Sequence, residues 1–273
     1  MKRNQRQKAK GLLLFAGLFL AGIAIAGVLC RDASMVTDFS RKNLAPCLQY
    51  PFGTDWLGRN MFYRTLTGLS MSIFIGMGAA GVSTVIAILL GTGAAILGRK
   101  TDSVICFAID MIMGIPHILL LLLISYACGK GLKGVVIGVA LTHWTSLARL
   151  IRSEVLQLKE SEYILIAQKL GHSKWEIAKK HMLPHLLPQF LVGLVLMFPH
   201  AILHESSVTF LGFGLSMEQP AIGIILSESM KYLIMGKWWL ALFPGIMLVL
   251  TVVLFDLGGT SLRKITDPNS VHE

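Results

Sequence analysis

The chain alternates between long apolar runs and short polar segments. Six runs approach or exceed the roughly 20 apolar residues that a helix needs to cross a bilayer. They cover residues 11–29, 68–98, 103–127, 132–148, 186–204 and 240–258. Proline inside such runs is tolerated better in membrane helices than in soluble ones. The pattern therefore predicts an all-α polytopic membrane protein with six transmembrane helices.

Composition supports this prediction and excludes other classes. Of the 273 residues, 54% are hydrophobic and 15% are charged, whereas soluble domains carry about 25% charged residues. A disordered chain, a coiled coil and an ordinary soluble enzyme are therefore excluded. The net charge of +10 is not gathered into a basic stripe with interleaved aromatic residues, so we expect no nucleic-acid partner. The four cysteines form no C-x-x-C pair; Cys30 and Cys47 share one loop and are either free or paired.

The distribution of basic residues predicts the orientation. With the N-terminus inside, the inner segments hold 16 Lys and Arg in 66 residues, and the outer segments hold 9 in 81. The positive-inside rule therefore places both termini in the cytoplasm. The first apolar run follows five basic residues but exceeds the 7–15 residues typical of a signal peptide, so we expect an uncleaved first helix.

These assignments divide the chain into three parts and a short tail. Residues 1–30 form the N-terminal tail and first helix, and residues 31–67 form an extracytoplasmic loop. Residues 68–268 form a core of five helices, with an inner loop at 149–185 and an outer segment at 205–239. Residues 269–273 are a tail.

The inner loop 149–185 carries two predicted short helices. Gly171 ends the first helix, and a capping-box spacing from Ser173 begins the second, which we expect to end before Pro184. The first helix has an apolar stripe formed by Tyr163, Ile166, Ala167 and Leu170. An apolar stripe followed by an exposed Trp175 favours a partner surface over a merely solvated basic loop.

The same loop resembles the EAA loop in the membrane subunits of ABC importers. The stretch from Glu162 to Ala167 is followed by Gly171 and then Leu183-Pro184 at the motif's spacing, although Leu165 and Ile166 replace the motif's Glu and first Ala. The resemblance implies that residues near 165–176 form a coupling helix that docks on an ATPase subunit. The implied coupling residues are Glu162, Ala167, Gly171, Trp175, Leu183 and Pro184.

Two further stretches narrow the resemblance to the "C" type permeases for dipeptides, oligopeptides and nickel. Residues 52–60 are similar to their G-T-D-x-x-G-R-D signature, with Asn60 in place of the final Asp, and residues 205–214 are similar to their E-x-x-L-S-F-L-G-L-G segment. Trp238-Trp239 and the tail with Asp267-Pro268 also match. The resemblance runs from about residue 50 to 268, nearly the whole chain.

The resemblance implies a type I ABC importer permease in the bacterial inner membrane. The implied partners are a homologous second permease, two ATPase subunits, an extracytoplasmic substrate-binding protein and membrane lipid. The chain lacks G-x-x-x-x-G-K-[ST], so we expect no enzyme activity and no tightly bound cofactor, with ATP used by partner subunits. In the outer segment, Pro220 predicts the first turn of a re-entrant helix that continues to about Met235.

Two histidines suggest the cargo. His200 and His204 lie four residues apart and therefore share one helix face, with Met197 nearby. Imidazole and thioether groups bind nickel and copper, and nickel-type permeases resemble this chain in having H-x-x-x-H here. We therefore predict nickel or a metal chelate as cargo, held transiently by His200 and His204. The alternative is a di- or oligopeptide importer in which both histidines are structural.

Other polar residues in the runs are less specific. Met197, His200, His204, Glu205 and Asp110 are the predicted substrate-pathway residues. Asp110 either faces the pathway or pairs with a neighbouring helix. Single histidines at 117 and 143 are expected to be packed core residues. An intramembrane metalloprotease needs H-E-x-x-H and is excluded because Ala201 occupies the Glu position, and a channel would not need the coupling loop.

Overall fold

The computed structural model describes residues 5–216 and 219–266, and these residues are almost entirely helical. The main helices are α1 (Gln5–Leu29), α3 (Met61–Ile96), α4 (Arg99–Gly114), α5 (His117–Ala127), α6 (Gly131–Lys159), α7 (Glu162–Lys169), α9 (Leu183–Phe210), α10 (Ile222–Leu233) and α11 (Trp239–Thr266). Shorter turns are α2 (Arg31–Met35), η1 (Phe39–Arg41), α8 (Lys174–Ile177) and the π-helical η2 (Ala178–Met182).

Five of the described helices, α1, α3, α6, α9 and α11, are long and apolar enough to cross a membrane. The third predicted span is not one straight helix: α4 and α5 meet at a bend of 98°. Pro116 has no amide hydrogen and forces Ile115 into an extended conformation, with φ −93° and ψ 136°, which ends α4. Only when α4 and α5 are taken together are they long and apolar enough for a sixth, broken span, and the prediction of one straight helix over 103–127 is wrong.

Several helices extend beyond the predicted apolar runs. Helix α3 starts at Met61, within the predicted outer loop, because the Asn60 side chain accepts a hydrogen bond from the Phe62 amide at 2.9 Å. Helix α6 continues to Lys159, into the predicted inner loop, and α9 continues to Phe210, into the predicted outer segment. Hydropathy marks only the apolar part of a helix, whereas backbone hydrogen bonding continues through polar residues.

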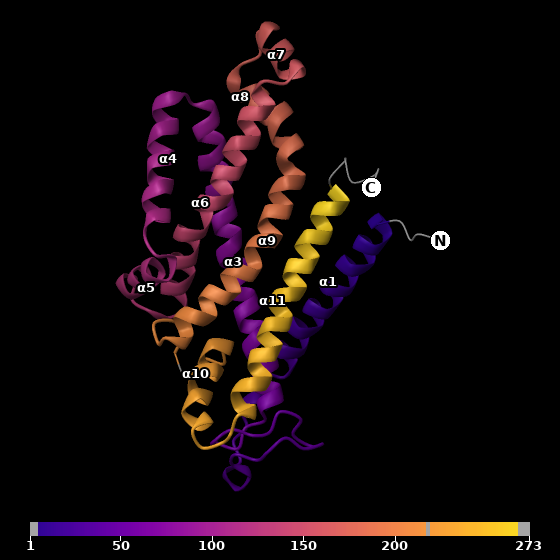
Figure 1. Cartoon of the computed structure of the whole chain (residues 1–273), viewed down its shortest axis with the longest axis vertical. Coiled ribbons are helices and arrows are strands. Elements are labelled where there is room, and N and C mark those ends of the chain that lie inside the picture. The colour runs from indigo at the N-terminus through magenta and orange to yellow at the C-terminus, as the bar shows by residue number, and fades with distance from the viewer. Residues whose placement is uncertain (1–4, 217–218, 267–273) are drawn as a thin grey trace.

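Helix α3 lies at the centre of the bundle and packs against α6, α1 and α9 (Figure 1). The contact with α6 is close because Gly91 has no side chain: a Cβ atom there would lie 2.6 Å from the Ala148 carbonyl oxygen. On the same interface, the Ser83 hydroxyl donates to the Ala140 carbonyl at 3.1 Å. Two buried apolar clusters, one around α3, α6 and α9 and one around α1, α3 and α11, form the core.

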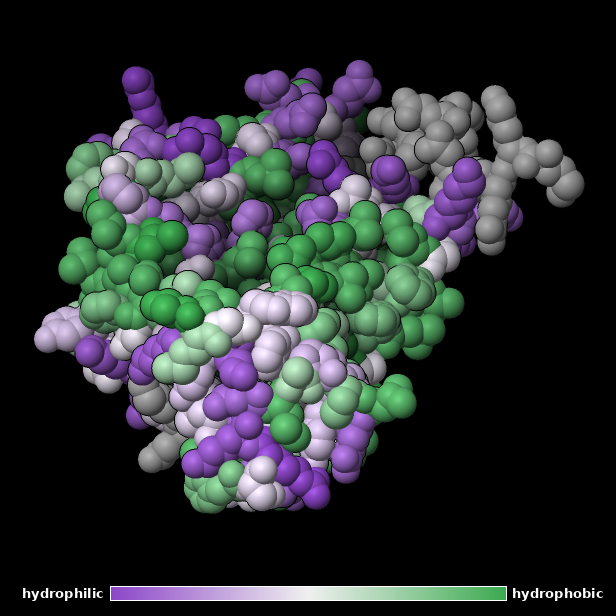
Figure 2. Space-filling model, turned by 60° about the horizontal axis from the view of Figure 1, so that its bottom comes forward, coloured by the Kyte–Doolittle hydropathy of each residue, from purple (hydrophilic) through white to green (hydrophobic). Residues whose placement is uncertain are grey.

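The bundle has two distinct ends and an apolar middle. Helix α1 begins and α11 ends at the end of the bundle that also carries α7 and α8 (Figure 1). The loop that joins α1 to α3 lies at the opposite end. Figure 2 shows hydrophobic side chains gathered in a belt, with polar residues on both sides of it. The arrangement agrees with the predicted placement of both termini and the inner loop on one side of the membrane.

The outer segment differs in detail from its prediction. Helix α10 has 12 residues, packs against α9 and α11, and is too short to cross a bilayer. It begins at Ile222, after Pro220 rather than around it, and ends at Leu233 rather than near Met235. Cys30 and Cys47 are both free thiols. The Asp267-Pro268 match and the tail 269–273 lie outside the described residues.

Candidate functional site

A cavity of about 710 Å³ lies between α6, α9 and the bend that joins α4 to α5. Its lining is apolar apart from hydroxyl groups and imidazoles, and the described residues that line it include no Asp, Glu, Lys or Arg. The bend at Pro116 creates one wall, because it turns α5 away from the direction of α4. The imidazoles belong to His117, His143, His200 and His204.

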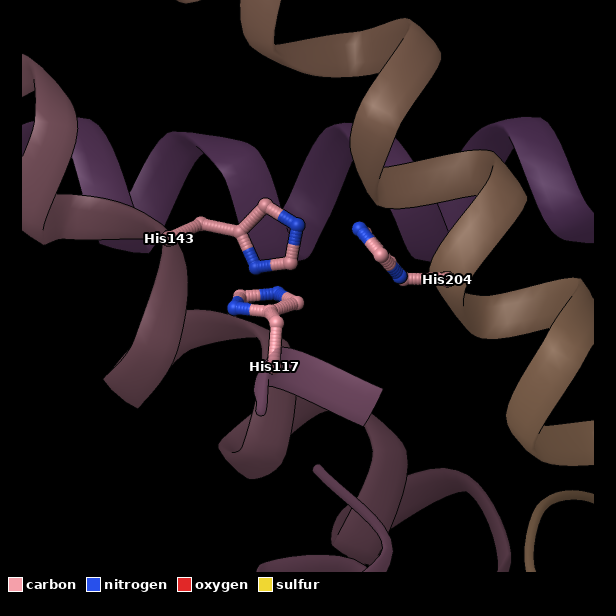
Figure 3. A group of neighbouring side chains, drawn as sticks. All are labelled: His117, His143 and His204. Atoms are coloured by element: carbon pink, nitrogen blue, oxygen red, sulfur yellow. The ribbon is translucent and has the colours of Figure 1, made fainter. Parts of the chain in front are cut away.

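Three of these imidazoles form a cluster. His117 begins α5, His143 lies in α6 and His204 lies in α9, and their rings point toward one another (Figure 3). One ring nitrogen of each lies within 4.8 Å of the corresponding atoms of the other two. The ring centroids are separated by 4.5 Å, 4.7 Å and 5.0 Å. We call these three residues the histidine triad.

Hydrogen bonding fixes the tautomer of one member of the triad. His143 Nδ1 lies 3.0 Å from the Val139 carbonyl oxygen. A carbonyl oxygen only accepts hydrogen bonds, so Nδ1 carries the hydrogen and Nε2 keeps its lone pair. His143 Nε2 is buried and has no hydrogen-bond partner among the described residues, and His117 Nε2 is in the same position. Two buried ring nitrogens therefore lie within the cluster without a hydrogen-bond partner in the described structure.

The triad differs from the predicted pair of histidines. His204 belongs to it, whereas His200, one turn earlier on α9, is not part of this close group but lines the same cavity together with Met197. His117 and His143, which we expected to be packed core residues, are partly buried, and both also line the cavity. Sequence spacing relates only residues on one helix, so it could not bring histidines from three helices together.

Two of the predicted pathway residues lie elsewhere. Glu205 is fully buried and accepts hydrogen bonds from the Thr209 and Ser206 hydroxyls, at 3.0 Å and 3.3 Å, and it is not among the residues that line the cavity. Asp110 pairs with Arg149 of α6 at 2.6 Å, with 67% of the Asp110 side chain exposed. The structure therefore supports the pairing alternative for Asp110 and a buried hydrogen-bonded position for Glu205.

The predicted coupling segment stands at one end of the bundle as α7 and α8 (Figure 1). Gly171 has φ +87°, the left-handed conformation that follows many helix ends, and thus confirms the predicted end of α7. The capping box is also present: the Glu176 amide donates to the Ser173 hydroxyl at 3.2 Å, and the Ser173 amide donates to the Glu176 carboxylate at 3.3 Å. The hydrogen bond from the Ser173 amide lowers the pKa of the Glu176 carboxyl, and the hydrogen bond and charge of Lys180 lower it further.

Large apolar side chains of this segment face solvent. Trp175 is 76% exposed and Leu170 is 74% exposed, whereas Ala167 is buried. Glu162 is the first residue of α7 and is exposed. The prediction that the second helix ends before Pro184 is wrong, because the chain continues through η2 into α9, and Leu183 and Pro184 form the first turn of α9. Proline is tolerated there because the first turn needs no amide donor.

A buried ion network joins the loop between α1 and α3 to α3 and α10. The Asp55 carboxylate is fully buried and accepts hydrogen bonds from the Leu57 and Arg59 amides, both at 2.9 Å, and from the Arg59 Nε at 2.6 Å. Arg64 of α3 also donates to Asp55, and its other nitrogen donates to Glu228 of α10 at 3.1 Å. The G-T-D-x-x-G-R stretch therefore holds the loop against both helices.

The chain combines an apolar helical bundle, a cavity lined mainly by apolar groups with several imidazoles and hydroxyls, and an exposed apolar segment at one end, which is consistent with the membrane subunit of a transporter. Sequence comparison identifies the family. Residues 83–269 match the profile of the binding-protein-dependent transport system inner membrane component. The chain belongs to this family, and it is an ABC importer permease subunit.

Relatives cover nearly the whole chain. The chain is 32% identical over 268 residues to the dipeptide transport system permease protein DppC of Bacillus subtilis (strain 168). The alignment covers 98% of this chain and 84% of that protein. It is 31% identical over 266 residues to the oligopeptide transport system permease protein OppC of the same strain, covering 97% and 87% of the two chains. Both relatives are named for peptide transport, and neither name mentions nickel.

Solved structures confirm the fold. The chain superimposes on the inward-facing MetNI methionine ABC transporter with a TM-score of 0.64, at 17% identity, covering 76% of this chain and 98% of that one. A second crystal form of the same transporter gives a TM-score of 0.63 at 16% identity. At this identity the similarity concerns the fold, which is the ABC importer permease fold.

Proposed function

We propose that this chain forms one half of the translocation pathway of an importer for di- or oligopeptides. The names of the relatives that match nearly the whole chain carry this proposal. A homologous second permease completes the pathway, an extracytoplasmic binding protein delivers the cargo, and two ATPase subunits supply the energy. In this proposal, cargo passes through the cavity between α5, α6 and α9.

The proposed contact with an ATPase subunit is the α7–α8 segment. Trp175 and Leu170 expose large apolar surfaces at a position where the bundle does not cover them. Such a surface stabilises an interface when a partner removes it from water. Gly171 and the capping box set the angle between the two short helices, so that docking movements are passed to α9 through η2.

A second cargo candidate, nickel or a metal chelate, is favoured by the chemistry of the cavity. A free peptide carries an ammonium and a carboxylate, and no charged side chain lies among the described residues that line the cavity. Imidazole, thioether and hydroxyl groups are present instead. Neutral imidazoles suit a metal cation better than they suit a zwitterion.

Uptake into proteoliposomes separates the two candidates. The assembled importer, with its binding protein, should accumulate a radiolabelled dipeptide in an ATP-dependent manner, and an excess of unlabelled nickel should not compete. Omission of ATP and replacement of the catalytic residue in the ATPase subunits are the controls. Accumulation of radiolabelled nickel without accumulation of dipeptides would overturn the peptide proposal and support the metal candidate.

A further inference from the structure

The histidine triad has the composition of a metal site built from three separate helices. His117, His143 and His204 lie far apart in sequence, and α5, α6 and α9 must all be in place to bring them together. A chance cluster of buried imidazoles would leave costly polar atoms without partners. Here the Nε2 atoms of His117 and His143 are such atoms. A ligand in the cavity that accepts their lone pairs would remove this cost.

The hydrogen bond of His143 is the kind that supports a metal ligand. Histidine ligands usually donate their second ring hydrogen to a carbonyl or carboxylate, which fixes the tautomer and the orientation of the ring. The Val139 carbonyl does this for His143 and leaves Nε2 as the lone-pair donor. Val139 is one turn before His143 on α6, so the helix itself supplies this support.

We propose that His117, His143 and His204 bind a late first-row transition-metal ion within the cavity. Three neutral nitrogen ligands favour nickel, cobalt, copper or zinc, and the absence of carboxylates from the cavity lining in the described structure disfavours calcium and magnesium. With metal–nitrogen distances of about 2.1 Å, tetrahedral ligands lie roughly 3.4 Å apart. The triad nitrogens lie within 4.8 Å of one another, so small ring rotations close the site.

The site is suited to transient binding. Three neutral ligands leave the positive charge of the ion uncompensated, and no Asp or Glu lines the cavity in the described part of the chain. Met197 and His200 continue the row of donor groups along α9.

The inference deepens the metal candidate for the cargo, but binding itself depends only on the triad. If the cargo is a peptide, the triad can still bind the ion. The peptide would then contact the triad as a complex with the metal. Binding and uptake are therefore measured separately. An importer that binds the metal at the triad but does not transport it would exclude metal as the cargo, and the proposed binding site would still stand.

Metal binding is measured on the assembled importer in nanodiscs, purified without a polyhistidine tag. Titration with cobalt, followed by its visible absorption, should show saturable binding that His117→Gln, His143→Gln and His204→Gln each weaken. Loss of a group that only hydrogen-bonds to a metal ligand costs about 10- to 100-fold in affinity, so loss of a ligand itself should cost at least as much. His172→Gln changes an exposed histidine outside the cavity and should leave binding unchanged.

Two controls keep the result decisive. Recovery of the assembled complex and its ATPase activity report whether each variant folds. If a variant fails to assemble, the unaltered importer is treated with diethyl pyrocarbonate, which modifies histidine side chains, with and without cobalt. Bound cobalt should protect the histidines of the triad from modification but should not protect His172. Unchanged cobalt binding in a folded triple variant, or no protection of the triad by cobalt, would overturn the proposal.

Discussion

Replacing Asp55 by Asn should destabilise the packing of the α1–α3 loop on α3 and α10 more than replacing an exposed charged residue of the same loop. The Asp55 carboxylate has no exposed surface, and one of its oxygens accepts hydrogen bonds from both Arg59 and Arg64. Asparagine keeps one acceptor for the two backbone amides but presents an NH₂ group to two guanidinium groups. Breaking a buried ion pair in this way costs about 3–5 kcal/mol. Arg59 loses its carboxylate partner while it stays buried, and Arg64 keeps only its contact with Glu228.

The assay is the apparent melting temperature of the assembled, detergent-solubilised complex, followed by size-exclusion chromatography after heating. Asp38→Asn is the matched control, because Asp38 pairs with Arg41 in the same loop at 3.0 Å while both side chains are about half exposed. Solvent screens that pair, so its loss should be small. Asp55→Asn should lower the apparent melting temperature clearly more than Asp38→Asn. Equal values for the two variants would refute the buried network as a source of stability.

Three further predictions concern the protruding segment and the topology. Trp175→Ala should reduce recovery of the ATPase subunits with the permease, whereas Trp238→Ala, an exposed tryptophan outside this segment, should not; equal recovery would contradict docking through α8. Gly171→Val forces a β-branched residue to φ +87°, at a cost of about 1–2 kcal/mol, and should abolish uptake while membrane insertion stays normal; normal uptake would exclude this segment from coupling. With the other cysteines replaced, an impermeant maleimide should label Cys47 in intact cells, but Ser173→Cys only after permeabilisation.

Local signals in the sequence predicted local structure well. Gly171 and the Ser173 capping box act within one helical turn, and both occur as predicted. The positions of the apolar runs predicted the membrane-crossing helices, because the bilayer requires a minimum apolar length. The helix ends were wrong by several residues where polar caps such as Asn60 extend a helix beyond its apolar part.

Features that depend on packing between helices were not predictable in this way. Pro116 was visible in the sequence, but whether it kinks a helix or breaks it by 98° depends on the neighbours of α5. The triad joins His117, His143 and His204 across three helices, so no spacing in the sequence relates them. Likewise, Asp110 pairs with Arg149 on another helix.

Cargo passage through the cavity between α5, α6 and α9 is the central claim, and thiol modification inside the cavity tests it most directly. In a background with all native cysteines replaced, Ser146→Cys places a thiol in the cavity lining, and Ser103→Cys places one on α4 outside it. After reaction with a water-soluble methanethiosulfonate, ATP-driven uptake of the imported cargo, whether dipeptide or nickel, should stop for Ser146→Cys and continue for Ser103→Cys. If the thiol introduced by Ser146→Cys is completely modified and uptake is unchanged, cargo does not pass through this cavity.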